Sequence, residues 1–349
     1  MTAPAIEAWW QRRPDVEQRS AATLASLVSQ ADRQELLRAY RELVPSDPRI
    51  EPHLAAVLAH VTMSPGSLVR GQLIFSAADR FGIRRQDARL LAIAIEYFHA
   101  ASLLFDDLPM MDDARERRGR PCAHQLFGES ASVLGALALI NQSYDLIWTA
   151  LESSGTQHAA RAQALVTACL GVRGVLSGQT RDLHFAPEGA SEERVLEVAR
   201  EKTVPLIRLT LQLLPMIGGA SESTLQALDR LAMAWGLSYQ ILDDCKDRLS
   251  AASESGKTPG RDDSLGRPNL LNQAGSRRVL ELLAAQRETA RGELAGLAAS
   301  GDGWPALARL QVKFDRELET TRAALERQPI RAGGPHCSLY ALPGGDVGH

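Results

Sequence analysis

Long segments in which apolar and helix-forming residues predominate alternate along the chain with short polar breaks. Alanine, leucine, glutamate, arginine and glutamine recur in the long segments, and runs of β-branched residues are few, which favours helices over strands. The pattern predicts helices near residues 17–28, 31–43, 51–62, 68–80, 85–108, 130–153, 157–178, 191–218, 221–249, 274–298 and 303–327.

The breaks between these segments contain residues that favour turns, such as Ser64-Pro65-Gly66 and the stretch from Gly256 to Pro268. No strand-rich half and no linker divides the core. We therefore expect one all-α domain over residues 1–327, built as a bundle of stacked helices. Residues 328–349 are rich in glycine and proline, and they are predicted to form an irregular C-terminal tail.

The composition limits the classes of function. Lysine and arginine number 39 and aspartate and glutamate 42, so the net charge of −3 argues against a protein that coats nucleic acid or an anionic membrane. The four cysteines form no CxxC pair, which fits a reducing cytoplasm. We find no signal-peptide run and no stretch of about 18 uncharged apolar residues. A cytoplasmic protein without stable membrane insertion is expected.

A first group of carboxylates, Asp106, Asp107 and Asp112, lies where a strongly apolar segment ends. Pro109 is expected to stop the helix and to let Asp112 return toward the other two. Because neighbouring carboxylates repel one another and raise one another's pKa, the group requires a counter-charge.

A second acidic cluster consists of Asp243, Asp244 and Asp247, again after a mostly apolar stretch. Asp243 and Asp247 are four residues apart and share one helix face, with Asp244 about 100° round from Asp243. Magnesium is usually held by one or two carboxylates together with substrate phosphates. One cluster alone would indicate a solvated helix end, but two clusters of the same pattern predict a magnesium diphosphate site.

Basic residues follow each acidic cluster and could bind phosphate. Arg117 and Arg118 lie in a segment of alternating arginines, and guanidinium groups match phosphate oxygens in bidentate geometry. A surface ladder of salt bridges is the alternative interpretation of that segment. Further polar candidates are Gln179, Lys202, Thr203, Lys257 and Arg267.

Together these motifs resemble the trans-prenyl diphosphate synthase family, and within it the bacterial geranylgeranyl diphosphate synthases. The two aspartate-rich motifs of the family are matched by DDLPMMDDARERRGRPCAH and by GLSYQILDDCKD followed by GKTPGRD. The intermediate motifs are matched by SGQTRDL and EKT. One DDxxD pattern is weak evidence, whereas the full set in this order, from about residue 60 to 275, is highly specific.

The resemblance implies a helical bundle around a central apolar cavity, and a role for each candidate residue. The magnesium ligands would be Asp106, Asp107, Asp112, Asp243, Asp244 and Asp247. The allylic diphosphate would be bound by Arg117, Gln179, Lys202, Lys257 and Arg267, and isopentenyl diphosphate by Arg70, His99 and Arg118. The residues closest to the chemistry would be Asp106, Asp107, Lys202, Thr203 and Asp243. A homodimer is also implied.

One position departs from the family pattern. Where the family usually carries a lysine that binds isopentenyl diphosphate, this chain has Ser67, although Arg70 is retained. Three hypotheses follow: elongation with Ser67 tolerated, ionisation of an allylic diphosphate followed by cyclisation or transfer to another acceptor, and a non-catalytic subunit of a heteromer. Complete aspartate clusters argue against the third, and only 17 aromatic residues argue against the second. Elongation is therefore ranked first.

In the trans-prenyl diphosphate synthase family, which this sequence resembles, the helix before the first acidic cluster sets the length of the product. Ala101 and Ser102 are small and should let the product pass, whereas Tyr97 and Phe98 could close the floor of the cavity one turn further. The hypothesis is a twenty-carbon product, geranylgeranyl diphosphate, with a fifteen-carbon product as the alternative. Packing of Tyr97 and Phe98 in the core, with the floor on another helix, is the other possibility.

Overall fold

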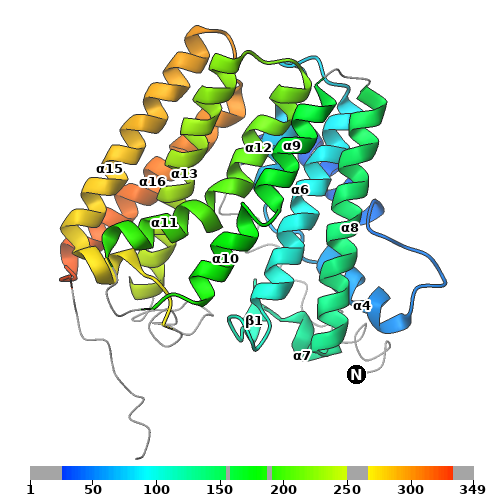
Figure 1. Cartoon of the computed structure of the whole chain (residues 1–349), viewed down its shortest axis with the longest axis horizontal. Coiled ribbons are helices and arrows are strands. Elements are labelled where there is room, and N and C mark those ends of the chain that lie inside the picture. The colour runs from blue at the N-terminus through cyan, green and yellow to red at the C-terminus, as the bar shows by residue number, and fades with distance from the viewer. Residues whose placement is uncertain (1–25, 155–157, 187–190, 250–265, 333–349) are drawn as a thin grey trace, which may run out of the picture.

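The computed structural model describes residues 26–154, 158–186, 191–249 and 266–332, and these residues form an almost entirely helical bundle (Figure 1). The all-α fold predicted from the sequence is confirmed. The helices are α3 (Gln30–Glu42), α4 (Pro52–Thr62), α5 (Val69–Ser76), α6 (Arg85–Asp106), α7 (Ala123–Phe127), α8 (Glu129–Ser154), α9 (Ala159–Leu170), α10 (Val175–Leu183), α11 (Glu192–Lys202), α12 (Val204–Ile217), α13 (Glu222–Leu249), α15 (Leu270–Ala299) and α16 (Pro305–Arg327). A short antiparallel hairpin, β1 (Glu116–Arg117) and β2 (Arg120–Pro121), lies between α6 and α7.

Helix α6 lies at the centre of the larger hydrophobic core. Its middle part is apolar on every side, and residues 91–95 are completely buried. It packs along α8 and also contacts α3, α5 and α12. By length and composition α6 is the one helix in the described part of the chain that could span a membrane, and 67% of its most apolar window is buried inside the protein. Burial on all sides is typical of a core helix, so the long apolar sequence of α6 is explained by its place inside the protein.

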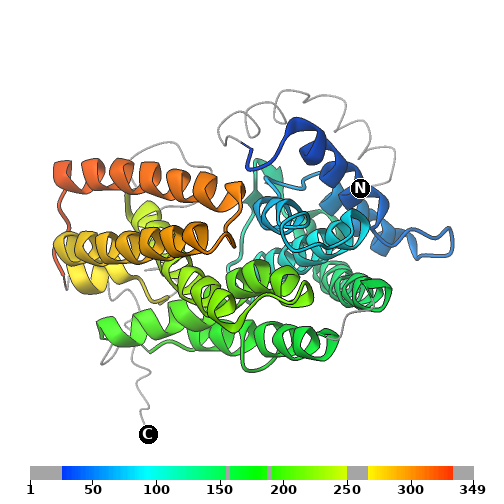
Figure 2. The same ribbon diagram turned by 90° about the horizontal axis from the view of Figure 1, so that it is seen from above.

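A second core holds the other end of the bundle together. The C-terminal half of α13 packs on α11, α15 and α16 through residues such as Ile241, Leu271 and Leu318. Figure 2 shows α15 and α16 at one end of the molecule, with α8 at the opposite end. Helix α13 therefore spans both cores: its N-terminal half packs in the larger core with α6, and the half that carries the second acidic cluster packs in the second core.

Two helices that the pattern predicted as continuous are broken in the structure. The expected helix 157–178 is wrong, because α9 ends at Leu170 and α10 begins only at Val175. At Gly174 a Cβ would lie 2.0 Å from the carbonyl oxygen of Cys169, so the turn requires glycine. The expected helix 191–218 is divided at Thr203, since Pro205 starts a new helix in its first turn.

Other boundaries differ less. The helix expected at 68–80 ends at Ser76, and the sequence pattern missed α7 and the hairpin. The helix expected at 17–28 has its first nine residues outside the described part of the chain, and its described end is not helical. In the expected tail, Ile330 forms two hydrogen bonds with Ser276. Its carbonyl oxygen accepts from the backbone N–H of Ser276 at 2.9 Å, and its own N–H donates to the hydroxyl oxygen of Ser276 at 2.8 Å. Residues 333–349 lie outside the described residues.

Candidate active site

The end of helix α6 brings the carboxylates of the first acidic cluster together. The helix ends at Asp106, Asp107 caps it, and the exposed Pro109 follows. The backbone N–H of Asp112 donates to the carbonyl oxygen of Asp106 at 2.9 Å, so the loop folds back onto the helix end. The charges of Asp106 and Asp112 consequently influence each other.

The two leading carboxylates of this cluster have different partners. Asp107 is 4% exposed and forms an ion pair with Arg117 at 2.6 Å. Asp106 accepts a hydrogen bond from Nε2 of Gln179 at 3.1 Å. Burial raises the pKa of Asp106 to about 6, and although the positive charge of Lys202 opposes this shift, the neighbouring Asp112 reinforces it. A cation bound at this point would favour the ionised carboxylates.

Helices α10 and α11 supply the adjacent basic group. Nζ of Lys202 donates to Oδ2 of Asp182 at 2.6 Å. Burial lowers the pKa of Lys202, but the negative charges of Asp182 and Asp106 have the larger combined effect, so this pKa is raised above its usual value. The two helices approach closely at Gly178, where a Cβ would lie 2.2 Å from the backbone nitrogen of Lys202. Lys202 is thus held as a cation beside the first acidic cluster.

A chain of hydrogen bonds leads from Thr203, the residue between α11 and α12, to the start of α15. The hydroxyl of Thr203 donates to Oε1 of Gln240 at 2.9 Å, and Nε2 of Gln240 donates to Oδ1 of Asp244 at 2.9 Å. The backbone N–H of Leu270 donates to Oδ2 of Asp244 at 2.7 Å. Because its hydrogen is engaged with Gln240, the Thr203 oxygen can only offer lone pairs to a neighbouring positive charge.

The three carboxylates of the second cluster therefore have different surroundings. Asp244 is 3% exposed, and both of its oxygens accept hydrogen bonds from the protein. Asp243 is exposed, and Asp247 is half-buried. The metal-binding role predicted for Asp244 would have to compete with two short hydrogen bonds, whereas the carboxylate of Asp243 is accessible.

The described residues contain no group of three or more histidine, cysteine, aspartate or glutamate side chains gathered closely enough to hold a metal ion. Magnesium usually takes one or two protein carboxylates and completes its coordination with substrate phosphates and water. The carboxylates of Asp106 and Asp112 in the first cluster and of Asp243 in the second are chemically suited to such a cation, because they offer only oxygens. Burial and the neighbouring carboxylate of Asp112 both disfavour ionisation of Asp106, and a divalent cation bound there would reverse that effect.

Arg267 links the first cluster to α10. Its guanidinium is 8% exposed and lies 3.6 Å from Asp112 and 3.7 Å from Asp182. It also donates to the carbonyl oxygen of Met111 at 3.1 Å. Arg267, Lys202 and Arg117 thus place three cations around the crowded carboxylates. Lys257, predicted to act with them, lies outside the described residues.

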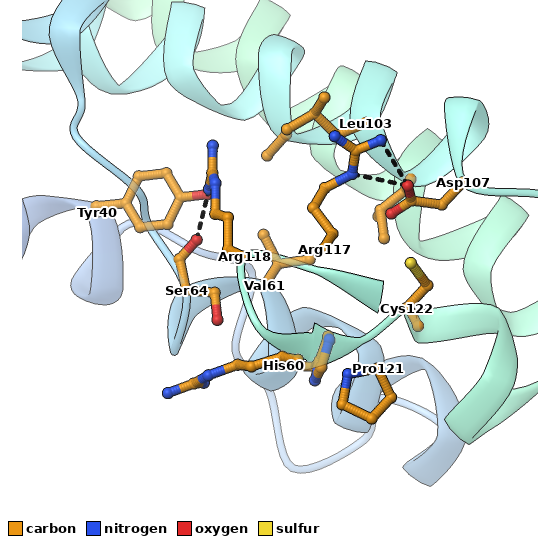
Figure 3. A pocket seen from close by; sticks show the side chains of 14 residues that line it. Tyr40, His60, Val61, Ser64, Leu103, Asp107, Arg117, Arg118, Pro121 and Cys122 are labelled. Carbon is orange, nitrogen blue, oxygen red and sulfur yellow. Dashed lines mark hydrogen bonds and ion pairs between the residues drawn. The ribbon is translucent and has the colours of Figure 1, made fainter. Parts of the chain in front are cut away.

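The hairpin directs two neighbouring arginines to different places. Arg118 (φ 55°) and Gly119 (φ 73°) both have positive φ, as a two-residue type I′ turn requires. Figure 3 shows Arg117 turned toward Asp107, and Arg118 turned toward Tyr40 and Ser64. Nη1 of Arg118 donates to the carbonyl oxygen of Ser64 at 2.8 Å. The guanidinium of Arg117 therefore pairs with the first acidic cluster, and that of Arg118 binds the loop before α5.

A second basic cluster forms around that loop from Arg70, His99 and Arg118. The Arg118 guanidinium packs on Gly66, where a Cβ would lie 2.5 Å from its Cζ. Burial lowers the pKa of His99 well below its usual 6.5, and the positive charges of Arg70 and Arg118 lower it further. His99 is therefore neutral at pH 7 and can donate one hydrogen bond. The three residues predicted to bind the second diphosphate lie close enough to influence one another.

A small pocket opens between α4, α6 and the hairpin, next to both arginines (Figure 3). Its lining is mostly apolar, with Val61 from α4, Leu103 from α6 and Pro121 from β2. Asp107, Arg117 and Arg118 also line it. The pocket borders side chains that were predicted to bind diphosphate or metal, and Tyr97, Phe98, Ala101 and Ser102 are not part of its lining.

The residues predicted to set product length do not share one environment. Ala101 is completely buried, Ser102 is half-buried, and Phe98 is 6% exposed one turn before Ser102. The Tyr97 hydroxyl donates to the carbonyl oxygen of Tyr40 at 2.7 Å, and its ring packs on that of Tyr40 with centroids 5.0 Å apart. Tyr97 is thus directed toward α3, which leaves Phe98 as the better candidate for the floor.

Three residues of this region were not among the predicted site residues. Asp182 pairs with Lys202, Gln240 connects Thr203 with Asp244, and Glu96 is buried close to Arg70. The first two belong to the matched motifs SGQTRDL and GLSYQILDDCKD, so the sequence carried a signal for them. Glu96 lies in an apolar run and had no such signal.

A sequence model of the Polyprenyl synthetase family matches residues 51–294, well over half of the chain. Among curated relatives, a geranylgeranyl diphosphate synthase of Pantoea ananas is 31% identical over 269 residues, which cover 76% of this chain and 86% of the relative. Both acidic clusters and both basic clusters lie inside the matched range.

Solved structures share the fold. A geranyltransferase from Legionella pneumophila superposes with a TM-score of 0.69 at 22% identity, covering 82% of this chain and 95% of its own. A geranyltransferase from Helicobacter pylori, in complex with magnesium and isoprenyl diphosphate, gives a TM-score of 0.67 at 22% identity, covering 85% and 99%. At this identity the likeness concerns the fold alone.

Proposed function

Since this chain belongs to the polyprenyl synthetase family, as a trans-prenyl diphosphate synthase, we propose that it condenses an allylic diphosphate with isopentenyl diphosphate to make geranylgeranyl diphosphate. The resemblance predicted from the motifs is confirmed at the level of the family. The product is proposed because the bacterial relatives with 31% and 32% identity are named geranylgeranyl diphosphate synthases.

One observation carries the proposal: two separate basic clusters flank the end of α6. Arg117 and Lys202 adjoin the carboxylates of Asp106 and Asp107, while Arg70 and Arg118 surround His99 nearby. Condensation needs two diphosphates bound at the same time. The allylic substrate loses its diphosphate as pyrophosphate, whereas isopentenyl diphosphate keeps its own. A cyclase of the same fold would need only the first, so the second basic cluster favours elongation.

Magnesium is proposed as the cofactor, with Asp106, Asp107 and Asp112 of the first cluster and Asp243 and Asp247 of the second as its candidate ligands. When bound there, it would neutralise negative charge on the departing pyrophosphate. The protein's own cations would share this work. Arg117 and Arg267 offer guanidinium N–H groups to the phosphate oxygens, and Lys202 adds a point charge from α11.

The chain's residues would then guide the reaction. The allylic C–O bond breaks and pyrophosphate leaves, the double bond of isopentenyl diphosphate forms the new C–C bond, and a proton is lost to the released pyrophosphate. The oxygen of Thr203, whose hydrogen is engaged with Gln240, would stabilise the transient positive charge. The apolar side chains of α6 would exclude water, which would otherwise quench the cation.

The proposal is tested by incubating purified protein with labelled isopentenyl diphosphate, with or without an allylic diphosphate and magnesium. Incorporation of label should require all three components, and chelation of the metal should abolish it. Label incorporated without an allylic diphosphate, or none with any of the allylic primers, would contradict the proposal.

Introducing a lysine at Ser67 should strengthen binding of isopentenyl diphosphate. Ser67 lies in the loop that contacts Arg118 and precedes Arg70, so a lysine there could add a charge-assisted contact to phosphate. Such a contact contributes about 1.5–3 kcal/mol. The KM for isopentenyl diphosphate should therefore fall about tenfold or more in Ser67→Lys, while Ser67→Gln, which lacks the charge, should leave it unchanged. An equal KM in both variants would show that the lysine finds no phosphate.

Shortening Phe98 should lengthen the product. Phe98→Ala would open space one turn below Ser102, so products longer than twenty carbons should accumulate. Tyr97→Phe serves as the matched control, because it removes the hydrogen bond to Tyr40 without opening the cavity and should keep the wild-type product. Chromatographic sizing of the dephosphorylated products measures both. An unchanged product in Phe98→Ala would place the floor on another helix.

We also propose that the protein is a cytoplasmic homodimer that binds no nucleic acid. Leu134 and Leu137 are about half exposed on the outer face of α8, which supports an interface there. The described cysteines, Cys122, Cys169 and Cys245, are buried and unbridged, which supports a reducing compartment. Light scattering would distinguish a dimer from a monomer, and Leu137→Arg should favour the monomer.

A further inference from the structure

A buried carboxylate, Glu96, lies on α6 within the second basic cluster. It is 5% exposed, in a run of α6 whose other members are apolar. A buried carboxylate is costly unless it is paired or hydrogen-bonded. Its presence in the core therefore indicates a specific task rather than packing.

The hydrogen bond of Glu96 holds the first turn of α5. Oε1 of Glu96 accepts from the backbone N–H of Gly71 at 2.8 Å, directly after Arg70. Gly71 itself is buried, and a Cβ there would lie 3.2 Å from Cγ of Glu96 and 3.3 Å from the carbonyl oxygen of Ala92, so α5 and α6 approach closely. The carboxylate thus fixes the point at which the chain presents Arg70.

The loop before α5 is held from two other sides as well. Nε2 of Gln72 donates to the carbonyl oxygen of Ser67 at 2.6 Å, and Arg118 donates to that of Ser64 at 2.8 Å. Within this loop Leu68 has a φ of 49°, an uncommon conformation for a branched residue that needs external support. The loop and the first turn of α5 are therefore held by three side chains, Gln72, Arg118 and Glu96, of which only Glu96 is acidic.

The charges around Glu96 explain why an acid is needed there. Burial raises the pKa of Glu96, whereas the positive charges of Arg70 and Arg118 and the N–H of Gly71 oppose that shift and favour the ionised carboxylate. The two guanidinium groups repel each other, and Arg117 adds a third positive charge nearby. An ionised Glu96 offsets part of this repulsion, which favours keeping the two guanidinium groups close to each other when no substrate is bound.

We propose that Glu96 is a positioning residue that keeps Arg70 and Arg118 together, ready to bind the diphosphate of isopentenyl diphosphate. The inference rests on the proposed function, because it concerns one of the two diphosphate sites. Glu96 does not bind the substrate, since its charge would repel phosphate. It acts by preorganising the two arginines, and this matters more in a chain that has Ser67 in place of a third cation.

The test compares Glu96→Gln with Asp87→Asn. Glutamine keeps the shape and the acceptor for Gly71 but removes the charge. Asp87 is a similarly buried carboxylate in the first turn of α6, paired with Arg84 at 2.8 Å, so Asp87→Asn reports the general cost of losing a buried acid from this helix. For each variant we would measure the KM for both substrates, kcat, the Tm and, by calorimetry, binding of isopentenyl diphosphate alone.

Glu96→Gln should raise the KM and Kd for isopentenyl diphosphate about tenfold or more, the usual size for loss of an outer supporting partner. The KM for the allylic diphosphate and kcat should change much less, and Asp87→Asn should alter neither KM. An unchanged or lower KM for isopentenyl diphosphate in Glu96→Gln, or an equal loss for both substrates, would overturn the inference. If wild-type protein failed to use isopentenyl diphosphate at all, the proposed function itself would fail.

Discussion

Replacing Asp243 with asparagine should lower kcat by about 10²–10³-fold and leave the Tm unchanged, the scale expected for loss of a group that stabilises transition-state charge. Asp243 is exposed in the last two turns of α13, so replacing its carboxylate leaves no buried group unpaired. The same replacement at the adjacent Asp244 should mainly lower stability and should affect kcat less. Its two oxygens accept from Gln240 and Leu270, and an amide can accept from only one of them.

Asp244→Asn should therefore lower the free energy of unfolding by about 1–3 kcal/mol, because a donor is left facing a donor in a buried site. Its effect on kcat should be smaller than that of Asp243→Asn. Urea unfolding and steady-state kinetics of both variants measure the contrast. If Asp244→Asn were as stable as wild type and as inactive as Asp243→Asn, the structural role assigned to Asp244 would be wrong.

Replacing Gly178 with alanine should damage both stability and activity. A Cβ there would lie 2.2 Å from the backbone of Glu201 and Lys202, and no side chain can move aside to make room. Overpacking of this kind costs about 1–3 kcal/mol, and more when the obstacle is backbone. Since α10 carries Gln179 and Asp182, displacing it from Lys202 by even 1 Å could reduce kcat by about 10²-fold.

Gly292→Ala is the matched control for Gly178→Ala. Gly292 is exposed in the interior of α15, and nothing lies within 4 Å of a Cβ built there. Alanine should therefore stabilise this helix by about 0.5–1 kcal/mol and leave kcat unchanged. Thermal unfolding and kinetics check both changes. A fully active and stable Gly178→Ala would mean that the two helices are not in contact as described.

The sequence predicted the fold because its helices depend on local features. Apolar runs bounded by polar turns place α6 and α13 within a few residues of their observed limits. The two largest errors, at 157–178 and 191–218, occurred where a single residue interrupts an otherwise helical pattern. Pro205 begins α12 within an apolar run, and Gly174 is required only because the carbonyl of Cys169 lies against it. Such a contact between neighbouring turns leaves no periodic trace in the sequence.

The site was less predictable than the fold, because the motifs specify residue types but not where each side chain points or how deeply it is buried. Asp243 and Asp244 are adjacent in one motif, yet one is exposed and the other is buried beneath α15. Tyr97 and Phe98 are also adjacent, and only the three-dimensional packing directs Tyr97 toward Tyr40. Glu96 could not be found from the pattern, since its partner, the N–H of Gly71, is 25 residues away.

The central claim, that this chain elongates an allylic diphosphate, is tested most directly by sizing its products. Purified protein and magnesium would be given dimethylallyl, geranyl or farnesyl diphosphate, each with and without isopentenyl diphosphate, and the dephosphorylated products would be separated by gas chromatography. The account predicts a twenty-carbon alcohol that forms only when isopentenyl diphosphate is present. Pyrophosphate and a hydrocarbon formed without isopentenyl diphosphate would contradict it and would identify a cyclase.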